Sequence, residues 1–373
     1  MQKGNKGGNR TLKVIATRST FARRASRYLC IMRFRPLLLL LPALLGACSK
    51  TVTPVRLDFI GTSALISGNK TVNPSDTLTT RGYAVGNDNV LTRLRITTKY
   101  EPTRNPVLYP VPLSGYDPKT AVNDDELVYL DSLVNPITST IIYTSPYRGG
   151  EYLFENRFSA RSTSGTELWQ YTIYDNTGQS ASRAYRLTAR KPDSAAVFHN
   201  YTALLRPVVR RLTADSAQVR DRARIFLSLR SGLLLPKYAV INNQSSLQAN
   251  QQLVDLVCVI KNSAISLNAP TDVSTLRLKS ATWPIANRRA TQLRSTTLST
   301  IDFANTSTTA AFNAVFAGGT AFANPLSTGT LAKTQVVAFQ IFENNQTYTG
   351  LILVSDLVLG TSPILTCLIK VQK

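Results

Sequence analysis

The chain has 373 residues and carries 43 Lys and Arg against 21 Asp and Glu, which gives a formal net charge of +22. Its single histidine excludes a multi-histidine metal site, and its basic residues form no stripe around a recognisable nucleic-acid-binding module. The densest basic group is residues 206–230, and the basic charge is interpreted as solvated surface or as attraction to anionic polymers. No nucleic-acid partner is predicted.

The first interpretable segment in chain order is a short apolar run, residues 37–45, between two arginines and the sequence Gly46-Ala47-Cys48. This is the layout of a secretory signal peptide. A membrane span needs about 20 apolar residues, so the run is too short for one. Five consecutive leucines in this setting are also untypical of a core strand.

The sequence Leu45-Gly46-Ala47-Cys48 resembles the bacterial lipoprotein signal, Leu-(Ala/Ser/Gly)-(Ala/Gly)-Cys. The resemblance implies that residues 32–47 are the signal peptide and that Cys48 is the lipidated first residue of the mature chain. It also implies a cell-envelope protein anchored to the outer membrane through its N-terminal lipid.

Two segments flank this signal. Residues 1–31 hold eight Lys and Arg and no acid, and are interpreted as untranslated or as an extended leader. Residues 48–54 are interpreted as a tether. Some outer-membrane lipoproteins of the Bacteroidota carry an acidic export signal just after the cysteine, but here no acid precedes Asp58. Exposure on the outer face is therefore not supported by this segment, and the side of the outer membrane stays undecided. From Cys48 onward the chain carries a net charge of +12.

Residues 55–191 are predicted to form an immunoglobulin-like β-sandwich. Short alternating or apolar runs are separated by turn residues, as this fold requires. The predicted strands are 55–60, 77–85, 91–100, 138–144, 151–163, 167–175 and 180–189. The last two form the clearest hairpin, joined by a turn at Asp175-Asn176-Thr177-Gly178. This hairpin resembles the closing strands of bacterial immunoglobulin-like or PKD-type modules.

A proline-rich insertion, residues 101–136, interrupts the strand rhythm and is the predicted place of partner contact. It concentrates oxygen ligands that suit Ca²⁺, at Asp117, Asn123, Asp124, Asp125, Glu126 and Asp131. Their spacing matches no EF-hand loop, and a solvated acidic loop is the alternative. No other cofactor is predicted.

Aromatic side chains supply a second set of candidates, because flat rings stack on sugars. The candidate glycan contacts are Tyr109, Tyr116, Tyr143, Tyr147 and Trp169. Aromatics at alternating strand positions are more often core residues, so packing is the alternative for Trp169, and the loop tyrosines between prolines are favoured.

Residues 192–200 are predicted to be a linker, with His199 as a surface or boundary residue. Residues 201–373 are predicted to be a second, β-rich domain with a few short helices. The clearest helix covers 308–316, with a shorter one in 244–252. The clearest strands cover 223–229, 253–260, 334–342, 347–354 and 363–371.

The second half resembles a group of poorly characterised Bacteroidota lipoproteins, such as those of Hymenobacter relatives. The resemblance rests on Val254-Asp255-Leu256-Val257, Ala269-Pro270-Thr271-Asp272, Trp283 with residues 287–291, residues 348–354 and the closing residues 369–373. It implies an envelope location and no known reaction. Cys258 and Cys367 lie in apolar strand-like runs, where a disulfide and two buried free thiols are both open.

Enzyme signatures are largely missing from the sequence. It contains no His-Glu-x-x-His helix, no Gly-x-Ser-x-Gly elbow and no Walker A loop. We therefore expect a mainly all-β, non-catalytic envelope protein that binds or scaffolds, with a glycan or another envelope protein as partner. A structural or adhesion module without a ligand is one alternative, and a carboxylate-dependent glycoside hydrolase is another.

Overall fold

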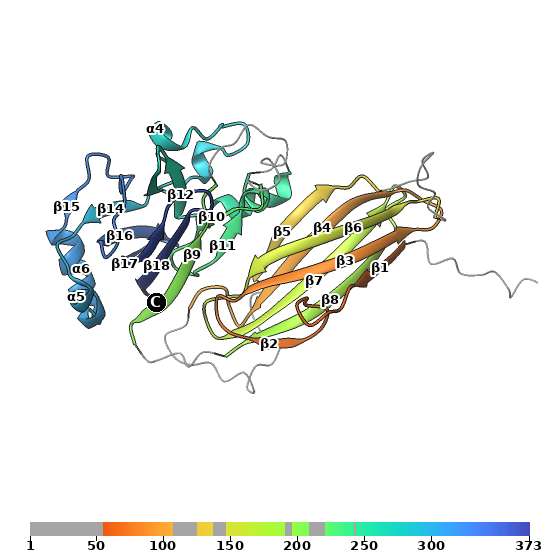
Figure 1. Cartoon of the computed structure of the whole chain (residues 1–373), viewed down its shortest axis with the longest axis horizontal. Coiled ribbons are helices and arrows are strands. Elements are labelled where there is room, and N and C mark those ends of the chain that lie inside the picture. The colour runs from red at the N-terminus through yellow and green to blue at the C-terminus, as the bar shows by residue number, and fades with distance from the viewer. Residues whose placement is uncertain (1–54, 107–124, 137–146, 191–195, 209–220, 242–243) are drawn as a thin grey trace, which may run out of the picture. The chain divides into compact units, whose positions relative to one another are not determined.

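The computed structural model describes residues 55–106, 125–136, 147–190, 196–208, 221–241 and 244–373 (Figure 1). These residues are mostly in antiparallel strands with a few short helices, which confirms the predicted mainly all-β class. No helix in these ranges has the length and apolar character needed to cross a membrane. Residues 1–54, including Cys48, lie outside the described ranges.

The first half is a sandwich of two sheets. One sheet has the strand order β1-β3-β6 and the other β2-β8-β7-β4-β5. The strands are β1 Val55–Phe59, β2 Lys70–Val72, β3 Thr77–Gly86, β4 Leu91–Glu101, β5 Asp125–Leu133, β6 Glu151–Ser159, β7 Gly165–Asp175 and β8 Ser180–Ala189. All neighbours are antiparallel except β2, which pairs in parallel with β8. Chain connections cross between the sheets, as in a Greek-key sandwich.

Alternating side chains explain why these segments form a sandwich. In β7 the side chains of Trp169, Tyr171 and Ile173 are fully buried, and across the hairpin Tyr185 and Leu187 join them. The carboxylate of Asp175 accepts hydrogen bonds from the backbone of Thr177 and Gln179 and so closes the predicted turn. The expected β7–β8 hairpin is confirmed.

Two sandwich strands are absent from the sequence prediction. The end of the predicted insertion, Asp125–Leu133, is the strand β5, which pairs with β4. The three-residue strand β2 is too short to show a pattern of its own. The predicted strand 138–144 lies outside the described residues.

The second half contains two further sheets. A six-stranded sheet has the order β15-β14-β16-β17-β18-β9, and a four-stranded sheet has the order β11-β10-β12-β13. The strands are β9 Phe198–Leu205, β10 Arg224–Leu227, β11 Leu234–Pro236, β12 Leu256–Lys261, β13 Ala264–Asn268, β14 Gln292–Ser295, β15 Thr320–Ala321, β16 Val336–Glu343, β17 Gln346–Val358 and β18 Ile364–Gln372. The predicted strands near the end of the chain are confirmed as β16, β17 and β18.

The four-stranded sheet is buried on both faces. In β10, Phe226 belongs to the core of the sandwich, whereas its neighbour Leu227 belongs to the core of the six-stranded sheet. In β12, Val257 packs into the first core and Cys258 into the second. Successive strand residues point to opposite faces, so this small sheet is shared by two cores.

Short helices complete the second half. They are η3 Lys237–Ala239, η4 Ser245–Leu247, α3 Gln248–Gln251, α4 Val273–Leu276, η5 Ile285–Asn287, α5 Thr300–Asn305 and α6 Thr309–Gly318. The predicted helix at 308–316 is confirmed as α6: Thr308 caps its first turn, and Phe312 and Phe316 are buried. The Lys370 ammonium donates hydrogen bonds to three backbone carbonyls at the end of α5, which satisfies acceptors that a helix end leaves open.

Candidate functional site

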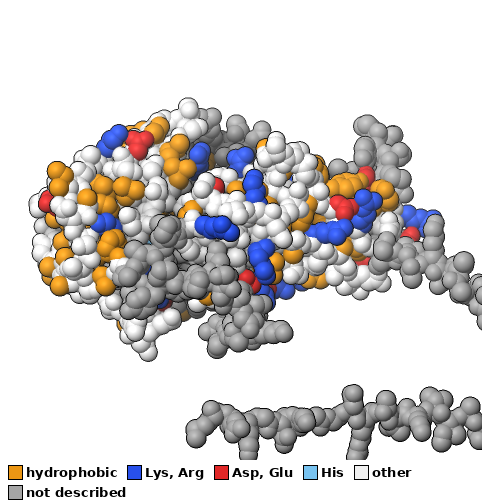
Figure 2. All heavy atoms as spheres, turned by 90° about the horizontal axis from the view of Figure 1, so that it is seen from below, with side chains coloured by type: hydrophobic (Ala, Val, Ile, Leu, Met, Phe, Trp, Pro, Cys, Tyr) orange, Lys and Arg blue, Asp and Glu red, His pale blue; other side chains and the backbone are white. Residues whose placement is uncertain are grey.

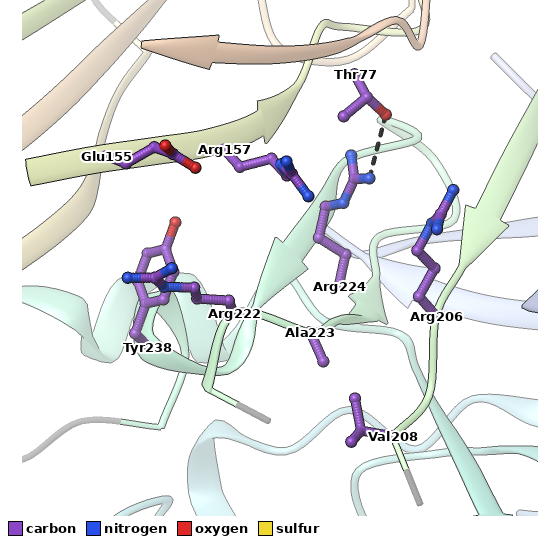
Figure 3. Close-up of a pocket in the computed structure, with 9 residues that line it drawn as sticks. All are labelled: Thr77, Glu155, Arg157, Arg206, Val208, Arg222, Ala223, Arg224 and Tyr238. Carbon is purple, nitrogen blue, oxygen red and sulfur yellow. Dashed lines mark hydrogen bonds between the residues drawn. The ribbon is translucent and has the colours of Figure 1, made fainter. Parts of the chain in front are cut away.

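A cavity of about 450 Å³ lies between β6 of the sandwich and the chain around β10 (Figure 3). This volume falls in the range of small-ligand sites. Its lining residues are Thr77, Glu155, Arg157, Arg206, Val208, Arg222, Ala223, Arg224 and Tyr238. We call it the arginine pocket, because four of the nine are arginines.

Strand geometry brings the four arginines together. Arg157 is on β6, where Phe154, Asn156 and Phe158 are buried and the intervening side chains are exposed on the outer face. Arg224 begins β10, and its carbonyl accepts a hydrogen bond of 3.2 Å from the backbone N–H of Arg206. In Figure 3 the guanidinium groups of Arg157, Arg224 and Arg206 lie on one side of the pocket, and that of Arg222 lies beside Tyr238.

No carboxylate in the described residues lies within ion-pair distance of any of the four guanidinium groups. The nearest acids are engaged elsewhere. Glu155 pairs with Arg81 at 2.8 Å, and Asp221 pairs with Lys237 at 2.7 Å. The hydrogen bond from Arg81 holds the pKa of Glu155 below its usual value. The pocket therefore keeps an excess of uncompensated positive charge.

Arg224 is the most unusual of the four, because only 6% of its surface is exposed. Among the described residues, its guanidinium bonds only to the hydroxyl groups of Ser159 and Thr77, the latter at 3.1 Å. Burial lowers the pKa of Arg224, and the positive charges of Arg206 and Arg157 lower it further. Arginine nevertheless stays charged in proteins, and buried charges normally have a counter-charge. An anion bound in the pocket would supply the missing counter-charge of Arg224.

A second cavity, of about 290 Å³, adjoins the first and shares Glu155, Arg222 and Tyr238 with it. Its remaining lining is mostly apolar: Leu94, Ile96, Leu130, Tyr152, Leu153 and Phe154, with Asn156 and Asp221. Together the two cavities expose the consecutive β6 residues from Tyr152 to Arg157. The combined site has a cationic end and an apolar end.

The chemistry of this lining is suited to binding. Arginine donates paired hydrogen bonds to carboxylate, phosphate or sulfate oxygens. Thr77 adds a hydroxyl at the cationic end. Burial raises the pKa of Tyr238 well above its usual value, so its phenol stays protonated and donates to Asn156 at 3.1 Å.

The structure places Trp169 in the core, where it cannot stack on a glycan. Its side chain is fully buried, its ring centroid lies 4.0 Å from that of Phe158, and its indole N–H donates to Glu167 at 2.9 Å. The candidate role of Trp169 in glycan contact is therefore withdrawn.

The remaining glycan candidates do not meet in one site within the described residues. Tyr147 is half-buried in a turn, where its carbonyl accepts a hydrogen bond from the backbone N–H of Gly150. Tyr109, Tyr116 and Tyr143 lie outside the described residues.

Some of the candidate calcium ligands lie in the described residues and others do not. Asp117 and Asp124 lie outside the described residues, and Asp125 begins β5. Glu126 lies 4.0 Å from Arg95, and Asp131 bonds to Arg93. Over the described ranges, no three His, Cys, Asp or Glu side chains gather as metal ligands.

Cys258 and Cys367 are both free and fully buried in the core of the six-stranded sheet, so the structure contains no bridge between them. Burial raises the pKa of the Cys367 thiol to about 12. Both thiols are packing groups.

His199 is a core residue on β9, although the sequence suggests a surface or boundary position. Its Nε2 lies 3.3 Å from the Oγ of Ser162, which in turn donates a hydrogen bond of 2.9 Å to the carbonyl of Ser231. Because that proton goes to a carbonyl, Ser162 is not arranged as a nucleophile for His199. Buried side chains alternate along β9 at Leu205, Ala203 and Tyr201, and the same alternation places His199 in the core. This pattern is the sequence signal that could have identified His199 as buried.

Two other buried carboxylates, Asp255 and Glu343, are both held by Arg289 at 2.8 Å. Glu343 also pairs with Arg230 at 3.0 Å, and the guanidinium of Arg230 lies 3.9 Å from the ring centroid of Tyr348. Neither carboxylate lines the two cavities described above. This cluster ties β12 to β16 and is structural.

The fold and the pocket define a β-rich protein with an arginine-lined cavity beside a sandwich edge. No protein-family model matches the chain, and no curated protein matches it. The chain is weakly similar to a DUF4466 family protein from Parabacteroides merdae, at 11% identity and a TM-score of 0.31, over 86% of this chain and 98% of that one.

Two other solved structures are similar at a lower level. A chain from the complex of a CaDoc0917 variant with CaCohA2 matches at 9% identity and a TM-score of 0.19, over 36% of this chain and 99% of that one. The sporulation control protein Spo0M from Bacillus subtilis matches at 11% identity and a TM-score of 0.21, over 57% of this chain and 78% of that one. At these TM-scores the similarities carry no functional information.

Proposed function

We propose that this chain is a lipid-anchored, non-catalytic binding protein of the cell envelope that takes up an anionic group in the arginine pocket. Its first half would be an immunoglobulin-like module, which the sheet orders β1-β3-β6 and β2-β8-β7-β4-β5 support. The anchor would be Cys48, which the lipoprotein-like signal supports.

One observation carries the binding role. Four arginines line a single cavity, one of them is almost fully buried, and none has a carboxylate partner among the described residues. An isolated buried charge is costly unless a partner compensates it. On the face drawn in Figure 2, Lys and Arg side chains are scattered among side chains of other types. Four arginines that line one cavity without a carboxylate partner among the described residues are better explained by a ligand than by solubility.

The binding role can be tested by calorimetry with the full chain and inorganic pyrophosphate as the probe. Arg157 and Arg222 are exposed at the rim, so a double Arg157→Gln/Arg222→Gln variant should fold normally. We expect its affinity to fall at least about tenfold, because charge-assisted hydrogen bonds are lost.

The matched control is Arg148→Gln/Arg190→Gln, which removes two exposed arginines that have no ion pair in the described structure. It lowers the net charge equally but leaves the pocket intact. Equal weakening in both double variants, or no pyrophosphate binding by the unaltered chain, would refute a specific anion site.

The anchor is tested separately, in cells. Cys48→Ser should move the protein from the membrane fraction to the soluble fraction and abolish incorporation of labelled fatty acid. An unchanged membrane fraction with an intact leader on the purified protein would disprove lipidation at this residue.

A further inference from the structure

The edge of β6 forms one wall of both cavities. β6 is the last strand of its sheet and pairs with β3 on one side only. In the described structure, backbone groups from Tyr152 to Phe158 make no hydrogen bond other than those to β3. An unpaired edge of this kind offers N–H and C=O groups to an incoming chain.

The edge strand of the other sheet, β5, lies on the same side of the sandwich, because Leu130 of β5 lines one cavity with β6. Residues of η3 and η4 from the second half of the chain pack against β5. The Asn250 side chain donates a hydrogen bond of 2.6 Å to the Val128 carbonyl, and Ser246 donates one of 2.8 Å to Asp131. The β5 backbone therefore has a hydrogen bond to the second half, whereas the β6 backbone from Tyr152 to Phe158 has none in the described structure.

Charge and polarity along the open edge change in a defined direction. Near Tyr152 and Leu153 the wall is apolar, and Leu153 is 57% exposed. Near Arg157 the wall is cationic, with Arg206, Arg222 and Arg224 facing the same cavity. A ligand lying along β6 would thus meet an apolar site first and then a cluster of guanidinium groups.

We propose that the ligand is an extended acidic polypeptide segment that adds as a strand to the edge of β6. Its backbone would pair with the open edge, its apolar side chains would contact Tyr152 and Leu153, and its carboxylates would bond to the arginines. Strand addition obtains affinity from main-chain hydrogen bonds and specificity from pockets for alternate side chains. The inference rests on the proposed anion-binding role of the arginine pocket and identifies its partner class.

An acidic glycan would satisfy the arginines but not the strand edge. Sugars lack the repeated amide groups that match a β ladder. A binding test of whether backbone amides are required therefore distinguishes an acidic peptide from an acidic glycan.

The test uses the full chain and a nine-residue acetylated peptide that alternates Val and Glu. We expect it to bind, to slow hydrogen exchange at β6 amides, and to bind at least about tenfold more weakly to Arg157→Gln/Arg222→Gln. Arg148→Gln/Arg190→Gln should bind as the unaltered chain does. The same peptide methylated at every amide nitrogen keeps its charge but cannot donate the N–H bonds of a β ladder, and should bind at least about tenfold more weakly.

Each contrary outcome has a separate meaning. Equal binding of the methylated peptide would overturn strand addition while leaving the anion site intact. Binding of an oligogalacturonate of matched charge, with no binding of the peptide, would assign the pocket to a glycan and overturn the peptide proposal. Failure of the peptide, the oligogalacturonate and pyrophosphate together would remove the proposed function itself.

Discussion

Arg224 is a nearly fully buried arginine with no carboxylate partner among the described residues. Its guanidinium is withdrawn from water, and its hydrogen-bond partners within the described ranges are the hydroxyls of Ser159 and Thr77. Replacing buried charges with apolar side chains of similar volume is often neutral or stabilising. The energetic role of Arg224 is therefore expected to differ from that of a core residue.

We predict that Arg224→Met leaves the free energy of unfolding unchanged or raises it by about 1 kcal/mol, because the desolvation cost disappears. Pyrophosphate affinity should fall in the same variant. Urea denaturation and calorimetry on one sample measure both effects. A loss of more than about 2 kcal/mol of stability would show instead that Arg224 holds the fold together.

The sequence shows the cluster of basic residues that contributes to the arginine pocket, but it does not predict that they line a cavity. Arg206, Arg222 and Arg224 fall in the densest basic group of the chain, for which solvated surface is the simplest interpretation from sequence. Arg157 lies about 50 residues earlier, and only strand pairing and sheet packing bring it to the others. Charge density is visible in the sequence, whereas the absence of counter-charges is a property of the folded molecule.

At the scale of elements, β5 shows how a polar pattern conceals a strand. Asp131 sits in a segment whose sequence predicts a proline-rich loop, yet its side chain is 1% exposed. It accepts hydrogen bonds from Arg93 on β4 at 2.6 Å and from Ser246 in η4 at 2.8 Å. Asp131, one of the acids that suggest a calcium loop, instead links the edge strand β5 to β4 and η4 through these hydrogen bonds.

This arrangement predicts a defined pH dependence. Burial alone would raise the pKa of Asp131, but the hydrogen bonds from Arg93 and Ser246 outweigh it, so the pKa lies below its usual value of 3.8. An acid with a lowered pKa in the folded state stabilises that state above its unfolded pKa. This contribution is lost as the pH falls through the lower, folded-state pKa.

We therefore predict that Asp131→Asn lowers the free energy of unfolding by about 1 to 2 kcal/mol at pH 7, with the difference shrinking below pH 3.8. Denaturant melts at several pH values measure it. Asp58→Asn removes a carboxylate from surface ion pairs with Arg56 and Arg183 and should change stability little. A constant effect of Asp131→Asn across the acid range would contradict the assignment.

Other elements are predictable where local signals agree. The β7–β8 hairpin has both alternation and a turn sequence, and α6 has a capping threonine and buried Phe312 and Phe316. The start of β9 is not predicted from the sequence, because His199 followed by Asn200 is a polar pair that does not suggest a buried strand. Its partner, β18, lies more than 150 residues away, so the pairing that buries His199 leaves no local trace.

At the scale of the whole molecule, the shared sheet makes residues 53–373 one compact unit. The sandwich core includes Phe226, Val257 and Trp283 from the second half of the chain. Neither half keeps its apolar surface covered without the other, so we expect cooperative unfolding.

The chain's two tryptophans make this measurable. Trp169 lies on β7, and Trp283 lies in a second-half segment that packs into the same sandwich core; each is fully covered. In Trp283→Phe the remaining Trp169 reports on β7 of the sandwich, and in Trp169→Phe the remaining Trp283 reports on the second-half segment packed into that core. Within each variant, the fluorescence midpoint in urea should coincide with the midpoint from far-ultraviolet circular dichroism. A fluorescence transition displaced from the backbone transition would show that the halves unfold separately.

The sheet β11-β10-β12-β13, buried on both faces, also determines whether the two fragments stay associated after the peptide chain is cleaved. If the peptide chain were cut between β8 and β9, the two fragments would still hold one another through the Phe226 and Val257 side of that sheet. They should migrate as a single species in a native gel and come apart only in denaturant. Neither fragment, expressed by itself, should remain in solution.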